Sequence, residues 1–252
     1  ASEVDLWLAF QLRMLAQQVD PFNLDKLNDR KLEAFQRLVF QTTKDAHIVS
    51  IFGDEGSELT PSVFIASADS PVVEGKEVVD AKRFESFRRA LPLSAMKSAR
   101  ESWQTAESPS ERPIIVGRPY TPEGRTIPVV PIVVPASAKS DLYLGVEFAL
   151  DRVDARFVHV AHDGIDLTLL DATGAPALRR GTGLAMAEKF KAFQPSSSCS
   201  DVRFTTAEGT EVMGACAPVP GTGWMVAVAE PMTTITRAGG EIQERTAYIG
   251  GL

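Results

Sequence analysis

The sequence predicts an α+β fold, in which a long N-terminal helix is followed by two units, each an antiparallel sheet of about five strands with helices on one face. Three observations predict it. Apolar residues recur at helical spacing from Val4 to Val19, short β-branched runs bounded by Gly, Pro and Asp follow in two successive series, and strands outnumber helices within each series. Sequential hairpins are the simplest topology for such a chain.

The N-terminal part is predicted to contain two helices. Val4 to Val19 presents a wide apolar stripe, which can contact its own unit and a partner helix together. Asp20-Pro21 interrupts this pattern. A second helix is predicted over residues 26–44, with Asn23 or Asp25 as its N-cap.

The first predicted unit begins at His47, where the sequence changes from helical spacing to short β-branched runs. Its expected elements are strands at 48–52 and 62–66, a helix at 80–106 broken at Pro92, strands at 113–119, 126–134 and 141–150, and a helix at 151–159. Prolines at 128, 131 and 135 lie in or beside one strand. Because proline cannot donate a ladder hydrogen bond, that strand is expected at a sheet edge or with a bulge.

The second predicted unit repeats the plan in shorter form from Gly164. Its expected elements are strands at 165–170 and 175–178, a short helix at 184–193, strands at 202–206, 212–217 and 224–230, and a helix at 231–246. The chain is therefore divided into N-terminal helices at 1–46, a first unit at 47–158, a second unit at 159–232 and an exit helix at 233–252.

Composition limits the class of protein. The 252 residues carry a formal net charge of -7 with no cluster of Lys and Arg, which disfavours nucleic-acid binding. No apolar run of eighteen residues and no signal peptide are found. A helix at the start and an apolar end are expected of a segment between two membrane helices.

The sequence contains two cysteines, Cys199 and Cys216. They either form a disulfide, which would stabilise the fold by roughly 3 kcal/mol, or stay as two free thiols.

Motifs for catalysis and metal binding are weak. Ser94 and Lys97 match the S-x-x-K pattern, but the accompanying K-T-G and S-D-N elements are missing. His159 and His162 are three residues apart without an evident third ligand. We therefore expect no enzyme, no cofactor and no metal site.

The order of four features resembles the double Cache (tandem PAS-like) periplasmic sensor domains of bacterial chemoreceptors, histidine kinases and cyclases. These features are the long first helix, the segment Gly117 to Arg125 (GRPYTPEGR), the strand Leu144 to Leu150 (LGVEFAL) and the strand Gly221 to Ala227 (GTGWMVA). The second is similar to the hairpin of the family's membrane-distal unit. The third and fourth resemble the strands that close the distal and proximal units.

The resemblance implies a periplasmic, ligand-sensing part of an inner-membrane receptor, with flanking transmembrane helices outside this chain. It implies a small-molecule pocket in the distal unit and a parallel homodimer formed through the first helix. The candidate ligand-binding residues by position are Arg100, Trp103, Arg118, Tyr120 and Tyr143. Guanidinium groups bind carboxylates, and aromatic side chains form pocket walls.

Two positions depart from the amino-acid-binding members of that family. Leu150 stands where those members have an acidic residue, and the stretch Arg100 to Gln104 matches their upstream motif only in part. Arg100 and Arg118 favour an organic acid as the ligand, with an amino-acid-like molecule also expected. Glu147 on the closing strand is interpreted as a solvent-facing residue, with a pocket position that favours a cation as the alternative. The rival function is a protein-interaction or adhesion module without a small ligand.

Overall fold

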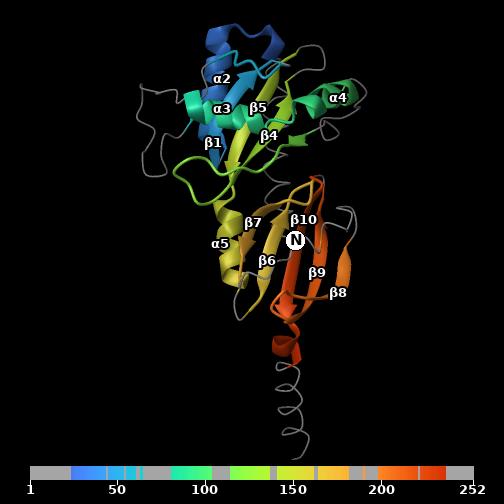
Figure 1. Ribbon diagram of the computed structural model, residues 1–252. Helices are drawn as coiled ribbons and strands as arrows, with labels where there is room; N and C mark the ends of the chain where they lie inside the picture. Colours follow the sequence, from blue (N-terminus) through green and yellow to red (C-terminus); the bar gives the residue numbers. More distant parts are fainter. Residues whose placement is uncertain are drawn as a thin grey trace, which may run out of the picture. The chain divides into compact units, whose positions relative to one another are not determined.

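The computed structural model describes residues 24–43, 45–53, 55–60, 63–64, 81–103, 114–136, 141–161, 164–181, 190, 198–220 and 222–236. These residues fall into two compact units, a first unit within Leu6–Asp151 and a second unit within Arg152–Leu252 (Figure 1). The first predicted helix and its dimer contact lie outside the described residues. So does the predicted helix at 184–193, apart from Phe190.

Each unit contains a five-stranded antiparallel sheet, and both sheets have the strand order second, first, fifth, fourth, third. The first sheet consists of β1 (Ala46–Phe52), β2 (Val63–Phe64), β3 (Ile115–Val116), β4 (Val129–Pro135) and β5 (Tyr143–Ala149). The second consists of β6 (Asp166–Leu170), β7 (Pro176–Arg180), β8 (Cys199–Thr205), β9 (Glu211–Val219) and β10 (Trp224–Pro231). The predicted α+β fold with two repeated units is confirmed.

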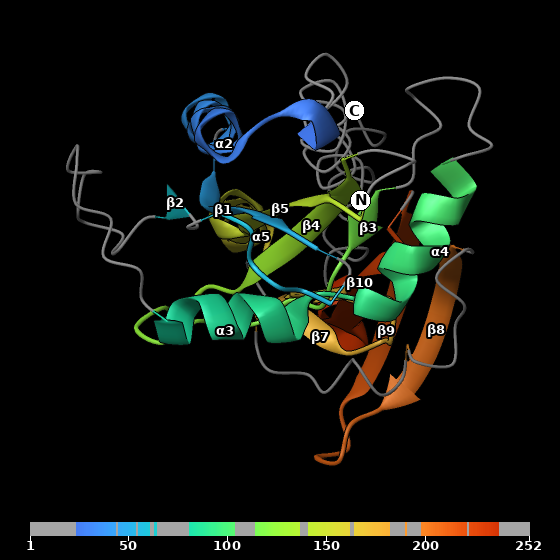
Figure 2. The same cartoon turned by 90° about the horizontal axis from the view of Figure 1, so that it is seen from above.

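Helices cover both faces of the first sheet, whereas the sequence predicted them on one face. The helices of the first unit are α2 (Asp29–Thr42), α3 (Ala81–Ala90) and α4 (Leu93–Trp103), and α5 (Asp151–Val160) leads into the second unit. Helix α2 packs on β1 and β2, and α4 packs on β3 and β4. Figure 2 shows α2 and α3 on opposite sides of this sheet. Residues 232–236, at the predicted start of the exit helix, are helical.

The start of α2 differs from the prediction. Neither Asn23 nor Asp25 caps it, because Leu24–Lys26 forms a short 3-10 turn whose Leu24 side chain is fully buried. Asn28 is the N-cap, and its side-chain oxygen accepts a hydrogen bond from the Lys31 amide at 3.1 Å. An asparagine in extended conformation satisfies an amide that the first helical turn leaves unbonded.

The predicted break at Pro92 is confirmed, because α3 ends at Ala90 and α4 begins at Leu93. Proline has no amide hydrogen to donate to the preceding helix. Its carbonyl instead accepts from the amide of Met96 at 3.2 Å and so opens α4.

The predicted edge position of the proline-containing strand is wrong. β4 lies between β5 and β3, so it is an interior strand. The Pro131 carbonyl accepts from the Gly117 amide at 2.8 Å, on the side of β3. Because the nitrogen and the carbonyl of one residue point to the same side of a strand, the missing donor also faces this side. β3 is only two residues long, so the sheet loses little pairing there.

The second unit contains a disulfide, which settles the alternatives left open by the sequence. Cys199 on β8 lies opposite Cys216 on β9, and their Cα atoms are 4.8 Å apart.

Among the described residues, no helix is long and apolar enough to cross a membrane.

Candidate functional site

Two polar side chains lie among apolar ones on the face of the first sheet that α3 and α4 cover. This face carries Ile48, Phe52 and Tyr143, which pack with Phe87 of α3 and Met96 of α4. Since side chains alternate along a strand, Ser50 of β1 and Glu147 of β5 share this face. Both residues are 0% exposed.

The strand register places these two polar residues next to each other. Ser50 lies opposite Gly145, and Glu147 lies opposite Ile48. Ser50 and Glu147 are therefore diagonal neighbours on one face, a relation in which side chains about 7 Å apart can still interact.

The hairpin between β3 and β4 brings a tyrosine to the carboxylate. Tyr120 and Val129 exchange two backbone hydrogen bonds of 3.0 and 2.8 Å, which fixes the position of Tyr120 beside the start of β4. The Tyr120 hydroxyl donates a hydrogen bond to Oε2 of Glu147. A phenol is a hydrogen-bond donor without a formal charge, and this contact orients the carboxylate.

The aromatic side of the site is rigid. Tyr143 is fully buried and stacks on Phe52 with ring centroids 6.0 Å apart. Its hydroxyl donates to the Met96 carbonyl at 3.3 Å. A Cβ atom on Gly145 would collide with Phe52 and lie 2.9 Å from Phe87, so only glycine leaves room for these rings.

The buried hydroxyl of Ser50 has no hydrogen-bond partner within the described part of the chain. A buried polar group without a partner costs about 1–3 kcal/mol. Such a group next to a buried carboxylate could bond a ligand with several donor hydrogens. A protonated amino group has three donors and the charge that complements Glu147.

The structure distributes the five predicted ligand-binding residues over different environments. Tyr120 and Tyr143 lie on the site face and pack in the same apolar cluster. Arg118 is exposed. Arg100 and Trp103 belong to α4, and their side chains lie outside the described residues.

Glu147 and Ser50 were not among the predicted site residues. The interpretation of Glu147 as solvent-facing is wrong, because every residue of β5 is buried. β5 is an interior strand covered on both faces, so its polar residue has no route to solvent. For Ser50 the signal was a single polar residue inside the otherwise apolar run Ile48 to Phe52.

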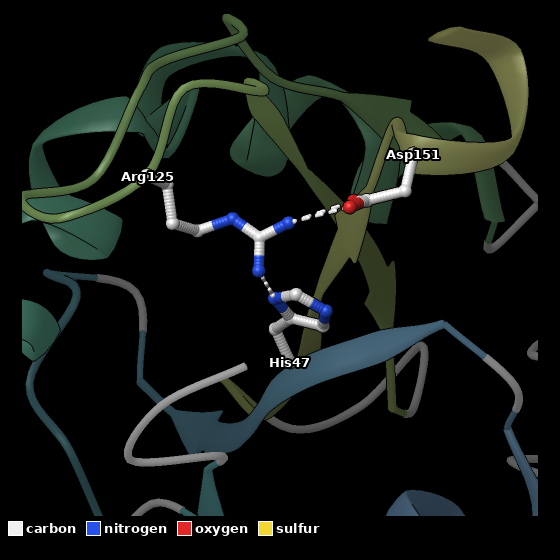
Figure 3. A network of polar contacts seen from close by, with 3 residues as sticks. All are labelled: His47, Arg125 and Asp151. Atoms are coloured by element: carbon white, nitrogen blue, oxygen red, sulfur yellow. Dashed lines mark hydrogen bonds and ion pairs between the residues drawn. The ribbon is translucent and has the colours of Figure 1, made fainter. Parts of the chain in front are cut away.

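A second polar cluster joins the hairpin loop to the ends of β1 and β5 (Figure 3). The Arg125 guanidinium binds both carboxylate oxygens of Asp151, at 3.0 and 2.7 Å. Its other terminal nitrogen lies 3.0 Å from Nδ1 of His47. Nothing in the sequence pattern predicted this cluster, because its three members are far apart along the chain.

The second unit has charged pairs of a different kind. Asp166 is fully buried and forms an ion pair with Arg179 at 3.3 Å. Asp154 of α5 forms an ion pair with Arg180 at 2.6 Å, which joins this helix to β7. Each of these carboxylates is thus matched by a guanidinium of the same unit.

No protein-family model matches the sequence, and no curated protein matches it. Several solved structures do match this chain. The ligand-binding domain of the Pseudomonas aeruginosa amino acid chemoreceptor PctC, solved with GABA, is 16% identical with a TM-score of 0.56, and the match covers 91% of this chain and 93% of that one. The domain of the Pseudomonas fluorescens chemoreceptor CtaA, solved with L-isoleucine, is 12% identical with a TM-score of 0.54, covering 94% and 90%.

An extracellular domain assigned to a histidine kinase, mmHK1S-Z3, is also similar. It is 10% identical with a TM-score of 0.58, and the match covers 95% of this chain and 93% of that one. At such identities the likeness concerns the fold. This chain has the two-unit fold of extracellular sensor domains, so the resemblance seen in the sequence is confirmed at the level of the fold.

Proposed function

We propose that the chain is the extracytoplasmic small-molecule sensing domain of a bacterial transmembrane signalling receptor of the chemoreceptor or histidine-kinase type. The observation that carries the proposal is the pair of buried polar residues, Ser50 and Glu147, on the helix-covered face of the first sheet. The sensor fold of the similar structures supports it. In this account residues 47–158 are the membrane-distal unit that binds the ligand, and residues 159–232 are the membrane-proximal unit.

A periplasmic location is supported by the disulfide of the second unit. Cys199 and Cys216 are bonded, and disulfides persist mainly in oxidising compartments. The extracellular origin of the similar histidine-kinase domain agrees with this location.

The proposed ligand is amino-acid-like or another small amine. The buried charge at the site is negative, so the complementary group is a protonated amine. GABA and L-isoleucine, which occupy the similar chemoreceptor domains, both carry an amino group. Arg100, Trp103 and Arg118 stay candidates for the other end of the ligand, where a guanidinium would bind a carboxylate. A plain organic acid, which has no amino group, fits Glu147 poorly.

A binding module is favoured over an enzyme. The similar structures are sensor domains. Ser94 and Lys97, the pair that resembles a catalytic motif, are both exposed on α4.

Thermal unfolding against a library of amines, amino acids and organic acids tests the proposal. A ligand at one hundred times its Kd stabilises the folded state by about 2.7 kcal/mol. We expect a saturable rise in Tm with an amine or amino acid. Glu147→Gln, which keeps the shape and removes the charge, should reduce this rise by about half or more.

Two further variants sharpen this test. Tyr120→Phe removes the hydroxyl that orients Glu147 and should weaken binding. Glu123→Gln removes an exposed carboxylate from the same hairpin and should leave binding unchanged. An undiminished Tm rise in Glu147→Gln would place the ligand elsewhere, and no rise across the library would favour the protein-interaction module.

A further inference from the structure

The His47–Arg125–Asp151 cluster is built on unusual backbone. β1 and β5 pair with a register shift, in which Ala46 lies opposite Phe148 and Ile48 lies opposite Glu147. His47 is therefore the extra residue of a β-bulge. Bulges re-aim side chains and are frequent beside functional sites. Asp45, two residues earlier, has a positive φ of 67°, which an aspartate adopts at a cost.

The Arg125 guanidinium connects three segments of the first unit. His47 is the extra residue in the bulge of β1, and Asp151, two residues after the end of β5, is the first residue of α5. The Arg125 side chain is only 16% exposed, whereas its partner Asp151 is 49% exposed. The same hairpin that carries Arg125 also carries Tyr120, which bonds the site residue Glu147.

The contact between Arg125 and His47 requires a neutral imidazole. An arginine is a donor at every accessible pH, so Nδ1 of His47 must accept the hydrogen bond. A proton on Nδ1 removes the acceptor and places two cations 3.0 Å apart. A histidine ordinarily titrates near pH 6.5.

Several described residues near His47 carry charges. Besides Arg125 and Asp151, the turn before β1 contributes Asp45, and the paired strand β5 contributes Glu147 one register position away. Helix α2 packs on β1, and its last charged residue, Arg37, is exposed. Asp151 is held at both oxygens by Arg125.

We propose that His47, Arg125 and Asp151 form a pH-sensitive latch that holds the Tyr120–Val129 hairpin against β1 and the end of β5. Above the titration range of histidine the latch is closed. As the pH falls through that range, His47 takes up a proton and Arg125 loses one of its two anchors. The hairpin then opens more often, and Tyr120, which orients Glu147, moves away with it. Acidity is in this way a second input to the first unit, independent of which ligand it binds.

Amide hydrogen exchange of the ligand-free chain, followed by NMR at pH 7.5 and 5.5 and corrected for intrinsic rates, tests the latch. The reporters are the amides of Arg125, bonded to the Pro122 carbonyl, and of Leu150, bonded to the Pro128 carbonyl. We expect their protection to fall about fivefold at pH 5.5. The Gly174 amide in the second unit, bonded to Asp171, should not change.

His47→Gln is the matched variant, because glutamine keeps an oxygen acceptor and does not titrate. Its Arg125 and Leu150 amides should be equally protected at both pH values. Unchanged protection in the natural chain, or the same loss in His47→Gln, overturns the latch. Should that variant not fold, the ¹⁵N shifts of the natural His47 imidazole decide: an unprotonated Nδ1 at pH 7.5 supports the latch, and a protonated one overturns it. No ligand is used, so failure here leaves the proposed function untouched.

Discussion

The two units have the same strand order and the same pairing of first and fifth strands, but they differ in the polar groups that this pairing buries. In the first unit the last residue of β1, Phe52, lies opposite Tyr143. In the second unit the last residue of β6, Leu170, lies opposite Met225. These pairs are equivalent, because each joins the end of the first strand to the start of the fifth and faces the apolar cluster of its unit.

Two residues further along, each unit has a buried hydroxyl next to a small residue. Ser50 lies opposite Gly145 in the first unit, and Thr168 lies opposite Ala227 in the second. Neither hydroxyl has a hydrogen-bond partner among the residues that the structure describes.

The next equivalent pair contains one carboxylate in each unit. It is Glu147 of the fifth strand in the first unit and Asp166 of the first strand in the second. The partners differ in charge, because Tyr120 offers a hydroxyl and Arg179 offers a guanidinium. Gly181 also lies so close to Asp166 that a Cβ atom there would overlap the carboxylate.

The two units therefore use the same sheet topology but give the buried carboxylate different roles. In the second unit the buried negative charge is matched by a cation of the same unit, and the group helps to hold β6 and β7 together. In the first unit the Tyr120 hydroxyl orients Glu147, the carboxylate that we propose binds a cationic ligand. Changes at the buried carboxylate and its partner should therefore affect stability in the second unit and ligand binding in the first.

The largest expected effect is loss of the disulfide. The double variant Cys199→Ser/Cys216→Ser removes a crosslink between residues 17 apart, worth about 3 kcal/mol in loop entropy. Amide exchange should show weaker protection in β9 and β10 and unchanged protection in β1 and β5. Equal loss in both units would mean that their stabilities are not separate.

Gly145→Ala should destabilise the first unit by about 1–3 kcal/mol, because the added methyl group collides with Phe52 and Phe87. Urea unfolding monitored by amide exchange in β1 and β5 measures this. The equivalent change in the second unit, Ala227→Gly, removes a methyl group and should cost about 1 kcal/mol. Full stability of Gly145→Ala would show that the rings can move apart.

Arg179→Ala should destabilise the second unit by about 1–2 kcal/mol. It leaves the carboxylate of Asp166 without one of its partners, and the effect is moderated because the Arg179 side chain is 39% exposed. Denaturant midpoints measure the loss. An unchanged midpoint would mean that other contacts of Asp166 suffice, and the contrast in charge matching between the units would lose its basis.

The smallest effects are expected from the two buried hydroxyls. Ser50→Ala and Thr168→Val each remove a buried hydroxyl without a partner and should be neutral or stabilising by up to about 1 kcal/mol. Only Ser50→Ala should also weaken ligand binding. Melting curves with and without ligand compare the two, and equal ligand effects would remove the functional distinction between them.

Much of the fold could be predicted from the sequence, because hydrophobic period, proline and glycine report local structure. The five-strand plan of each unit, the break at Pro92 and the start of α5 at Asp151 follow from such local signals. The position of β4 in the sheet did not, because it depends on which side of the strand the missing donor of Pro131 faces. That is decided by pairing with β3, which is distant in the sequence.

The candidate site was only partly predictable. Tyr120 and Tyr143 were found through the family resemblance. The sequence favours a surface position for Glu147, since a carboxylate is seldom fully buried. Ser50, and the contact of His47 with Arg125, depend on the register between β1 and β5 and on the bulge within it, which no local pattern encodes.

The central claim is that the first unit binds a ligand through Glu147. Isothermal titration calorimetry of the amine or amino acid found in the thermal screen, with the natural chain, Glu147→Gln and Thr168→Val, tests it most directly. The account predicts at least a tenfold rise in Kd for Glu147→Gln, because a charge-assisted hydrogen bond contributes about 1.5–3 kcal/mol, and an unchanged Kd for Thr168→Val. An unchanged Kd for Glu147→Gln together with lost binding in Thr168→Val would contradict it and place the ligand in the second unit.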